Sequence, residues 1–205
     1  MRCFGQFRMI GRTNRSTLLD GWFVPPRFRL MAAQNVRVSS IYMDAETQRR
    51  FDQACEELGW TSKSLVRQCI QAFFKVHQSF YAGAALADCA SREMTAEDYY
   101  RKLRDKGEDS LSPYLSNRPS FGVSPLATIP AVPTTDANRR RYNLLTLGGY
   151  NLVLLRVARI VDLSPQSQII SRIVAHHFQT YWATNYQPQI ELDKTCKFEL
   201  KENTL

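Results

Sequence analysis

VRVSSIYMDAETQRRFDQACEELGWTSKSLVRQCIQAFF, residues 36–74, has the clearest pattern in the chain and predicts one short strand followed by two helices. Successive side chains of a strand point to opposite faces. In residues 36–43 we therefore expect Ile41 and Met43 on the face toward the helices. The opposite face holds three candidate contact residues: Val38, Ser40 and Tyr42. That face is the first candidate binding surface of the chain.

Two amphipathic helices are predicted after this strand. Asp44 is a good N-cap for the first helix, and Gly59 is a good residue to end it. Thr61 or Ser62 can cap the second helix. Apolar residues recur at spacings of three and four in both helices, so each helix has one face for a core. These residues are Phe51, Ala54, Cys55 and Leu58, then Leu65, Val66, Cys69, Ile70, Phe73 and Phe74.

A weaker copy of the same pattern lies near the C-terminus. RYNLLTL, residues 141–147, predicts a strand with Leu145 and Leu147 inward. Its predicted outward residues are Tyr142, Leu144 and Thr146. Two more helices are expected in residues 148–182, the second beginning at Ser164 and Pro165. The copies align with one inserted residue near the turn between the helices. Gly148 and Gly149 replace the acidic cap, and residues 152–155 are more apolar than their counterparts.

The segments RVSSIYMDAET, ELGWTSKSLV and RQCIQAFF, in this order, resemble the ribbon-helix-helix family of DNA-binding proteins. The resemblance implies a dimeric fold whose paired antiparallel strands lie in the DNA major groove. The expected fold class is mainly α, with two ribbon-helix-helix copies of one short strand and two helices each, plus a middle helix. In that family the strands usually present Arg, Lys, Gln or Asn to the bases, and the predicted outward residues here include none of these.

A single copy is too small to bury both apolar helix faces, so each copy needs a partner. Residues 36–43 can pair with residues 141–147 of the same chain, which gives a single-chain pseudo-dimer. Alternatively, each copy pairs with its twin in a second chain, which gives a homodimer. The presence of two complementary copies in one chain favours the first arrangement.

The charge balance favours an anionic partner. The chain has 27 Lys and Arg against 19 Asp and Glu, a net charge of +8. Together with this balance, the resemblance to the ribbon-helix-helix family implies double-stranded DNA as the partner and a role in transcription regulation. The predicted phosphate-contacting residues are Arg37, Thr61, Ser62, Lys63, Arg139, Arg140, Arg141, Ser164 and Ser167. For the four residues with hydroxyl groups, helix capping alone is the alternative.

A second hypothesis keeps the fold without base reading. The apolar outward residues Val38 and Leu144 motivate a protein-interaction adaptor or an antitoxin-like module. The outward strand residues are also compatible with low-specificity binding that depends on DNA shape.

The remaining segments differ in composition. Residues 1–35 hold six arginines and one acidic residue, which is consistent with a basic arm, a transit peptide, or an extension before a native start at Met31. The predicted organisation is copy 1 in 36–82, a helical extension in 83–106, a Pro- and Ser-rich linker without a core in 107–138, copy 2 in 139–182 and a tail in 183–205. Gly83 is expected to end the second helix, and Thr95 to cap the extension. The tail alternates apolar and charged residues, which predicts a short strand, a hairpin or a frayed end.

Several classes of function have no signature in the sequence. The five cysteines form no C-x-x-C pair, and no nucleophile elbow, phosphate loop or zinc motif occurs. We therefore expect no enzyme activity, cofactor, metal or small-molecule ligand. His177 is expected in the core, with a role as a pH switch as the alternative. No apolar run reaches the roughly 20 residues that cross a bilayer, so a cytoplasmic, nucleoid-associated protein without a membrane partner is expected.

Overall fold

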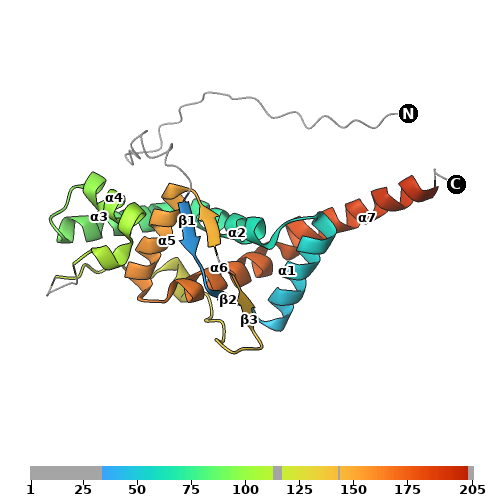
Figure 1. Ribbon diagram of the computed structural model, residues 1–205, viewed down its shortest axis with the longest axis horizontal. Coiled ribbons are helices and arrows are strands. Elements are labelled where there is room, and N and C mark those ends of the chain that lie inside the picture. Colours follow the sequence, from blue (N-terminus) through green and yellow to red (C-terminus); the bar gives the residue numbers. More distant parts are fainter. Residues whose placement is uncertain (1–33, 113–116, 143, 203–205) are drawn as a thin grey trace, which may run out of the picture. The chain divides into compact units, whose positions relative to one another are not determined.

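A computed structural model describes residues 34–112, 117–142 and 144–202, which all belong to the unit Met31–Leu205. Within these ranges the protein is mainly helical, with two short two-stranded sheets (Figure 1). Residues 1–33 lie outside the described residues. They include nearly all of the predicted N-terminal arm, and also Met31, the alternative start.

The strand segments of the two copies form one interrupted antiparallel ribbon. Strand β1 (Gln34–Arg37) pairs with β4 (Leu144–Leu147), and β2 (Ser40–Tyr42) pairs with β3 (Arg139–Arg141). The register is the same in both sheets, because Arg37 lies opposite Leu144 and, three residues later, Ser40 lies opposite Arg141. The segments near residues 40 and 144 thus pair within one chain.

Two helices follow the strands in each copy, and corresponding helices begin 104 residues apart. Helices α1 (Ala45–Leu58) and α2 (Ser62–Val76) match α5 (Gly149–Asp162) and α6 (Gln166–Tyr181). The predicted inserted residue is therefore wrong. Gly59 and Leu163 both end their helices in the left-handed conformation, with φ of 67° and 49°. The sequence concealed this match because only the first copy has the glycine that usually adopts this conformation.

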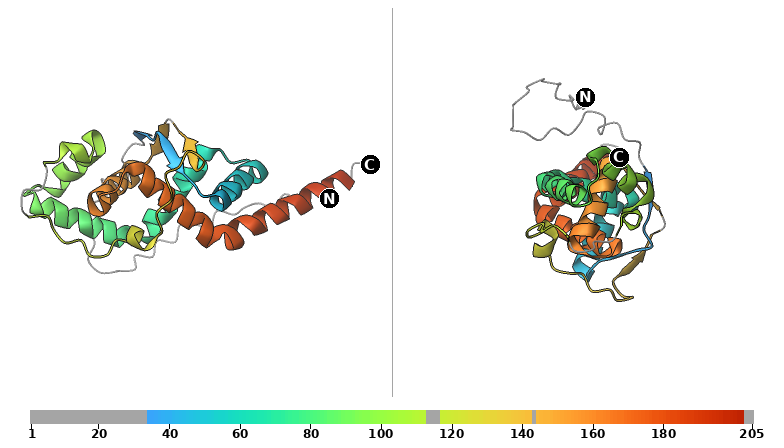
Figure 2. Two further views of the ribbon diagram at one scale, coloured as in Figure 1. Left: turned by 90° about the horizontal axis from the view of Figure 1, so that it is seen from below. Right: turned by 90° about the vertical axis from the view of Figure 1, so that its left-hand side faces the viewer.

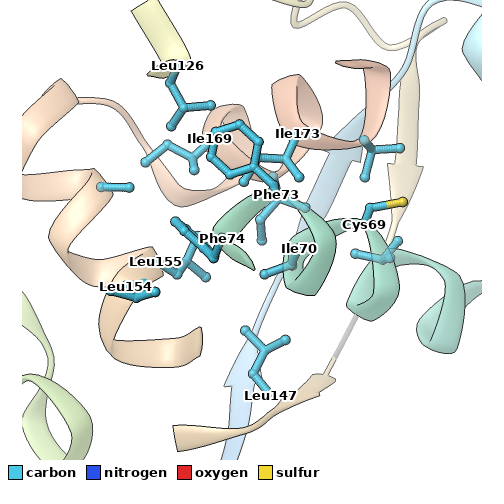
Figure 3. Close-up of a cluster of buried hydrophobic side chains, with 14 of the residues drawn as sticks. Cys69, Ile70, Phe73, Phe74, Leu126, Leu147, Leu154, Leu155, Ile169 and Ile173 are labelled. Carbon is cyan, nitrogen blue, oxygen red and sulfur yellow. The ribbon is translucent and has the colours of Figure 1, made fainter. Parts of the chain in front are cut away.

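The core lies between α2, α6 and the inner face of the ribbon. Figure 3 shows Cys69, Ile70 and Phe74 of α2 in one cluster with Ile169 and Ile173 of α6. The inward orientation predicted for four strand residues is confirmed, because each is at most 1% exposed: Ile41, Met43, Leu145 and Leu147. Burial of a large apolar side chain contributes about 1.5–3 kcal/mol. The ribbon is therefore held firmly against the helices through alternate side chains.

Helices α3 (Gln78–Ser91) and α4 (Ala96–Lys106) replace the single helix expected after residue 83. Gly83 lies inside α3 and does not end a helix, which corrects that prediction. Thr95 caps α4 as predicted, with its hydroxyl accepting from the Asp98 N–H at 3.1 Å. Both helices pack on α5. They cover a second face of α5, which explains why residues 152–155 are all apolar and fully buried.

The predicted linker packs against the helices, so the expectation that it contributes no core is wrong. It contains the short helices η2 (Glu108–Ser110) and η3 (Pro125–Thr128). Apolar residues spaced by three are buried in it: Leu126, Ile129 and Val132. Arg172 on α6 donates to the Ile129 carbonyl at 3.0 Å and also to the Leu126 carbonyl. The carbonyl groups of this segment are therefore bonded to α6 and not to water. Its proline content had suggested a flexible linker.

The C-terminal tail is helical, which corrects the predicted strand or hairpin. A π-helical turn, η4 (Trp182–Tyr186), joins α6 to α7 (Gln187–Glu202). The Trp182 and Tyr186 rings stack with centroids 6.0 Å apart, and Ile190 is buried. Lys194 forms an ion pair with Glu57 on α1 at 2.8 Å. Figure 2 shows the far end of α7 leading away from the other helices.

None of the helices in the described residues combines the length and apolar character that a membrane span requires.

Candidate nucleic-acid interface

Exposed and buried side chains alternate along the ribbon, and this alternation changes phase at its middle. In β1 the odd-numbered Asn35 and Arg37 are exposed, whereas Val36 is buried. After the interruption at residues 38–39, the odd-numbered Ile41 and Met43 are buried. Because a regular strand keeps each parity on one face, the interruption reverses which residues reach solvent.

This reversal corrects the prediction for Val38, which is only 2% exposed. Ser40 has the same parity as the outward Tyr42, but it too is only 2% exposed, so neither Val38 nor Ser40 presents a free side chain. The Ser40 hydroxyl accepts from Arg139 Nε at 2.9 Å. Tyr42 and Tyr142 are half-buried, while Leu144 and Thr146 are exposed as predicted.

The ribbon has two halves, which we name after one residue of each. The Asn35 half consists of Asn35, Arg37, Leu144 and Thr146 on β1 and β4. The Arg139 half consists of Ser40, Tyr42, Arg139 and Arg141 on β2 and β3. The constant separation of 104 residues relates each position of one half to a position of the other: Asn35 to Arg139, Arg37 to Arg141, Ser40 to Leu144, and Tyr42 to Thr146.

Arg37 and Arg141 are both exposed, and neither guanidinium has an ion-pair or hydrogen-bond partner among the described residues. The Arg37 carbonyl accepts from Gln166 Nε2 at 3.1 Å, which fixes the backbone and leaves the side chain free. Next to Arg37, the Thr146 hydroxyl donates to Asn35 Oδ1 at 2.7 Å. The ribbon therefore presents two exposed guanidinium groups, without partners among the described residues, at equivalent positions.

Arg140, predicted to contact phosphate, is instead used inside the protein. Its guanidinium pairs with Asp52 on α1 and donates to the Ser62 hydroxyl at 3.2 Å. It also lies over the Phe51 ring, 4.8 Å from the centroid. These contacts attach β3 to the start of α2 and engage the guanidinium with internal partners.

The start of α2 borders an open pocket of about 620 Å³. The pocket is lined by Thr61, Ser62, Lys63, Arg140, Arg141 and Tyr142. Thr61 caps α2 through its hydroxyl, which accepts from the Ser64 N–H at 3.2 Å. Burial raises the pKa of Tyr142 to about 12, so its hydroxyl stays protonated at neutral pH. The predicted residues Lys63 and Arg141 thus lie beside a helix N-terminus, where exposed N–H groups and the helix dipole favour an anion.

The start of α6 differs from that of α2. Ser164 does not cap the helix, because its hydroxyl donates to the Asp162 carbonyl at 3.1 Å and Pro165 occupies the N-cap position. The Ser167 carbonyl accepts from the Ser171 hydroxyl, which in turn accepts from the Tyr42 N–H at 2.8 Å. This end of the second copy is therefore tied to the ribbon, and the pocket beside Ser164 and Pro165 is lined by acidic as well as basic residues: Arg92, Arg159, Glu108 and Asp109.

Sequence reasoning missed Asn35 as an outward residue and placed Arg37, Arg139 and Arg141 only at phosphate. The available signal was the alternation of Asn35, Val36, Arg37 and Val38, whose phase conflicts with that of Ile41 and Met43. Two phases in one segment indicate an interruption between them.

A search against protein-family models, curated proteins and solved structures finds no match to this chain. Among the described residues, no three His, Cys, Asp or Glu side chains are arranged to hold a metal ion.

Proposed function

We propose that this protein is a DNA-binding transcriptional regulator that inserts its two-stranded ribbon into the major groove, in the manner of the ribbon-helix-helix proteins. One observation carries the proposal. The exposed face of an antiparallel ribbon formed within one chain presents Arg37, Arg139 and Arg141 together with Asn35 and Thr146. Arginine forms paired hydrogen bonds with guanine, and a two-stranded ribbon fits the width of the major groove.

The surroundings of the ribbon support the same proposal. Lys63 and the N-terminus of α2 lie beside Arg141 around one pocket. A DNA phosphate in this pocket would fix the orientation of the ribbon, while the strand residues read the bases. The net charge of +8 favours the approach of DNA. In this proposal one chain is a pseudo-dimer that supplies both strands.

The test is duplex binding by the full chain across a series of salt concentrations. Phosphate contact requires the affinity to fall steeply as salt rises. The double variant Arg37→Ala, Arg141→Ala is expected to lose about 5- to 150-fold in affinity for each arginine removed, which corresponds to about 1–3 kcal/mol per arginine. Measurement by fluorescence anisotropy with an enriched duplex gives these values.

The matched control is the double variant Lys75→Ala, Lys194→Ala on α2 and α7, which removes the same charge. Lys194 pairs with Glu57 on α1 and Lys75 borders a pocket with Trp60 and Tyr186, and neither lysine has a hydrogen bond or ion pair with a strand among the described residues. The control should bind nearly as well as the wild-type protein. Equal losses in the two double variants would show that only net charge matters and would contradict groove reading.

A protein-interaction module on the same fold is the second candidate. Leu144 favours it, because this apolar side chain is 41% exposed on the ribbon. Val38 no longer favours it, since this residue is buried. If the ribbon binds a protein through Leu144 and not DNA, Leu144→Ala reduces the cellular effect and Arg37→Ala, Arg141→Ala leaves it intact, whereas groove reading predicts its loss in the double arginine variant.

A further inference from the structure

We propose that the ribbon reads an imperfect inverted repeat, in which one base position is common to both half-sites and the flanking positions differ. This inference rests on the proposed function and adds the class of DNA site that the ribbon fits. It is carried by the register of the strands and by the residues that the two halves expose.

The register makes the site an inverted repeat. The strands are antiparallel, and the relation of 104 residues exchanges β1 with β3 and β2 with β4. This relation has its centre at the interruption of the ribbon, between residues 38 and 39 on one strand. Equivalent positions therefore face the groove in opposite directions on either side of the centre, as the half-sites of an inverted repeat do.

Arg37 and Arg141 provide the common position. They are equivalent, exposed and without side-chain partners among the described residues. Because Arg37 lies opposite Leu144 and Arg141 lies opposite Ser40, they are three residues apart along the ribbon. At about 3.3 Å per residue this separation is about 10 Å, or about three base-pair steps in DNA. Two guanines on opposite strands at about this spacing fit the pair.

The flanking positions differ between the halves. In the Asn35 half, the residue opposite Arg37 is the exposed Leu144, which can contact a thymine methyl group. In the Arg139 half, the residue opposite Arg141 is Ser40, whose hydroxyl is engaged by Arg139.

The outer positions also differ. The Asn35 half ends in a hydrogen-bonded pair of Asn35 and Thr146, which is uncharged. The Arg139 half ends in the pair of Tyr42 and Arg139, and Arg139 gives this pair a positive charge. A homodimer would repeat one set of side chains in both halves and read a symmetric site. Because a single chain supplies the two halves here, their base preferences are separate.

Selection of bound duplexes from a random library by the full chain tests this inference. The expected motif is not self-complementary and contains the two guanines about three base pairs apart. Arg37→Ala should reduce the base preference about tenfold in one half-site only, and Arg141→Ala in the other only. A palindromic motif, or single variants that each change both half-sites equally, would overturn the inference while the proposed function stands. If no duplex is enriched, the result contradicts both the inference and the proposed function.

A symmetrising variant gives the converse result. The triple variant Asn35→Arg, Leu144→Ser, Thr146→Tyr gives the Asn35 half the side chains of the Arg139 half. All three positions are exposed, so the core is unchanged. Its selected motif should become palindromic, with both half-sites like the one that Arg141→Ala affects in the parent. A motif that stays asymmetric in this variant, while its unfolding transition matches that of the parent, overturns the inference.

Discussion

Arg37 and Arg141 occupy the same position in the two halves of the ribbon, although 104 residues separate them in the chain and different residues lie opposite them. Arg140, next to Arg141, has the reverse role, because its side chain contacts Asp52, Ser62 and the Phe51 ring. Of these neighbouring arginines on β3, Arg141 is exposed on the surface and Arg140 attaches the strand to the helices.

Arg140→Met is expected to lower the free energy of unfolding by about 1–2 kcal/mol, because it removes an ion pair and a cation–π contact that are partly buried. Arg141→Met is expected to change it by less than about 0.5 kcal/mol, since that side chain is exposed and unpaired among the described residues. Urea unfolding of both variants measures the difference. Equal destabilisation by the two would contradict the internal role of Arg140.

The helix ends at Gly59 and Leu163 predict opposite effects of substitution. Leu163 has a φ of 49° and is 72% exposed, so Leu163→Gly should relieve strain and increase the unfolding free energy by up to about 1 kcal/mol. Gly59→Ala should lower it by about 1 kcal/mol, through backbone strain alone, because nothing lies within 4 Å of an added Cβ. Thermal unfolding measures both, and Leu163→Ala, which keeps the strain, is the control. A loss of stability in Leu163→Gly would contradict the assignment of strain.

His177 should make stability depend on pH. Burial, and to a lesser extent the charge of His176, lowers the pKa of His177 to about 4, and its Nε2 lies 2.8 Å from the Tyr186 hydroxyl oxygen. The unfolded chain takes up the proton near pH 6.5, so the unfolding free energy should fall as pH falls from about 6.5 to about 4, by at most about 3 kcal/mol.

The variant His177→Phe tests this prediction by urea unfolding between pH 7 and pH 4. Phe73 occupies the equivalent position in α2, so phenylalanine is compatible with this place in the fold. The variant should lose most of the pH dependence in this range, although His77 and His176, whose pKa values are also lowered by burial, contribute a smaller change of the same sign. An unchanged slope would assign the dependence to other groups.

Arg172 should hold the segment of residues 124–132 against α6. Arg172→Met removes hydrogen bonds to the Leu126 and Ile129 carbonyls and should cost about 2 kcal/mol of stability. Hydrogen exchange should increase in this segment more than elsewhere. Arg101→Met, at an exposed ion pair on α4, is the control and should have little effect. Protection that is unchanged in Arg172→Met would show that apolar packing alone holds the segment.

Regular alternation and helical spacing predicted the helices of both copies and the inward face of Ile41, Met43, Leu145 and Leu147. These patterns are local, so they can be recognised in a short window of sequence. The contacts of Ser40 and Arg140 are instead with residues that are distant in the sequence. The hydroxyl of Ser40 is engaged by Arg139, and Arg140 pairs with Asp52, 88 residues away.

The linker and the tail were mispredicted for a related reason. Their apolar residues are few and widely spaced, and they become buried only because α6 and α1 offer surfaces to them. Arg172 and Lys194, which make these attachments, look like ordinary surface cations in the sequence. The exposed face of the ribbon was predictable in part, since Leu144 and Thr146 are outward, but its arginines were assigned to phosphate alone.

Pairing of the first and last strands delays folding during synthesis. Residues 34–42 leave the ribosome long before residues 139–147, so the ribbon closes only after about 100 more residues have been made. Until then the apolar side of α2 has no α6 to cover it. The nascent chain must keep this side from aggregating, and truncation before residue 139 would leave the N-terminal half without its complement.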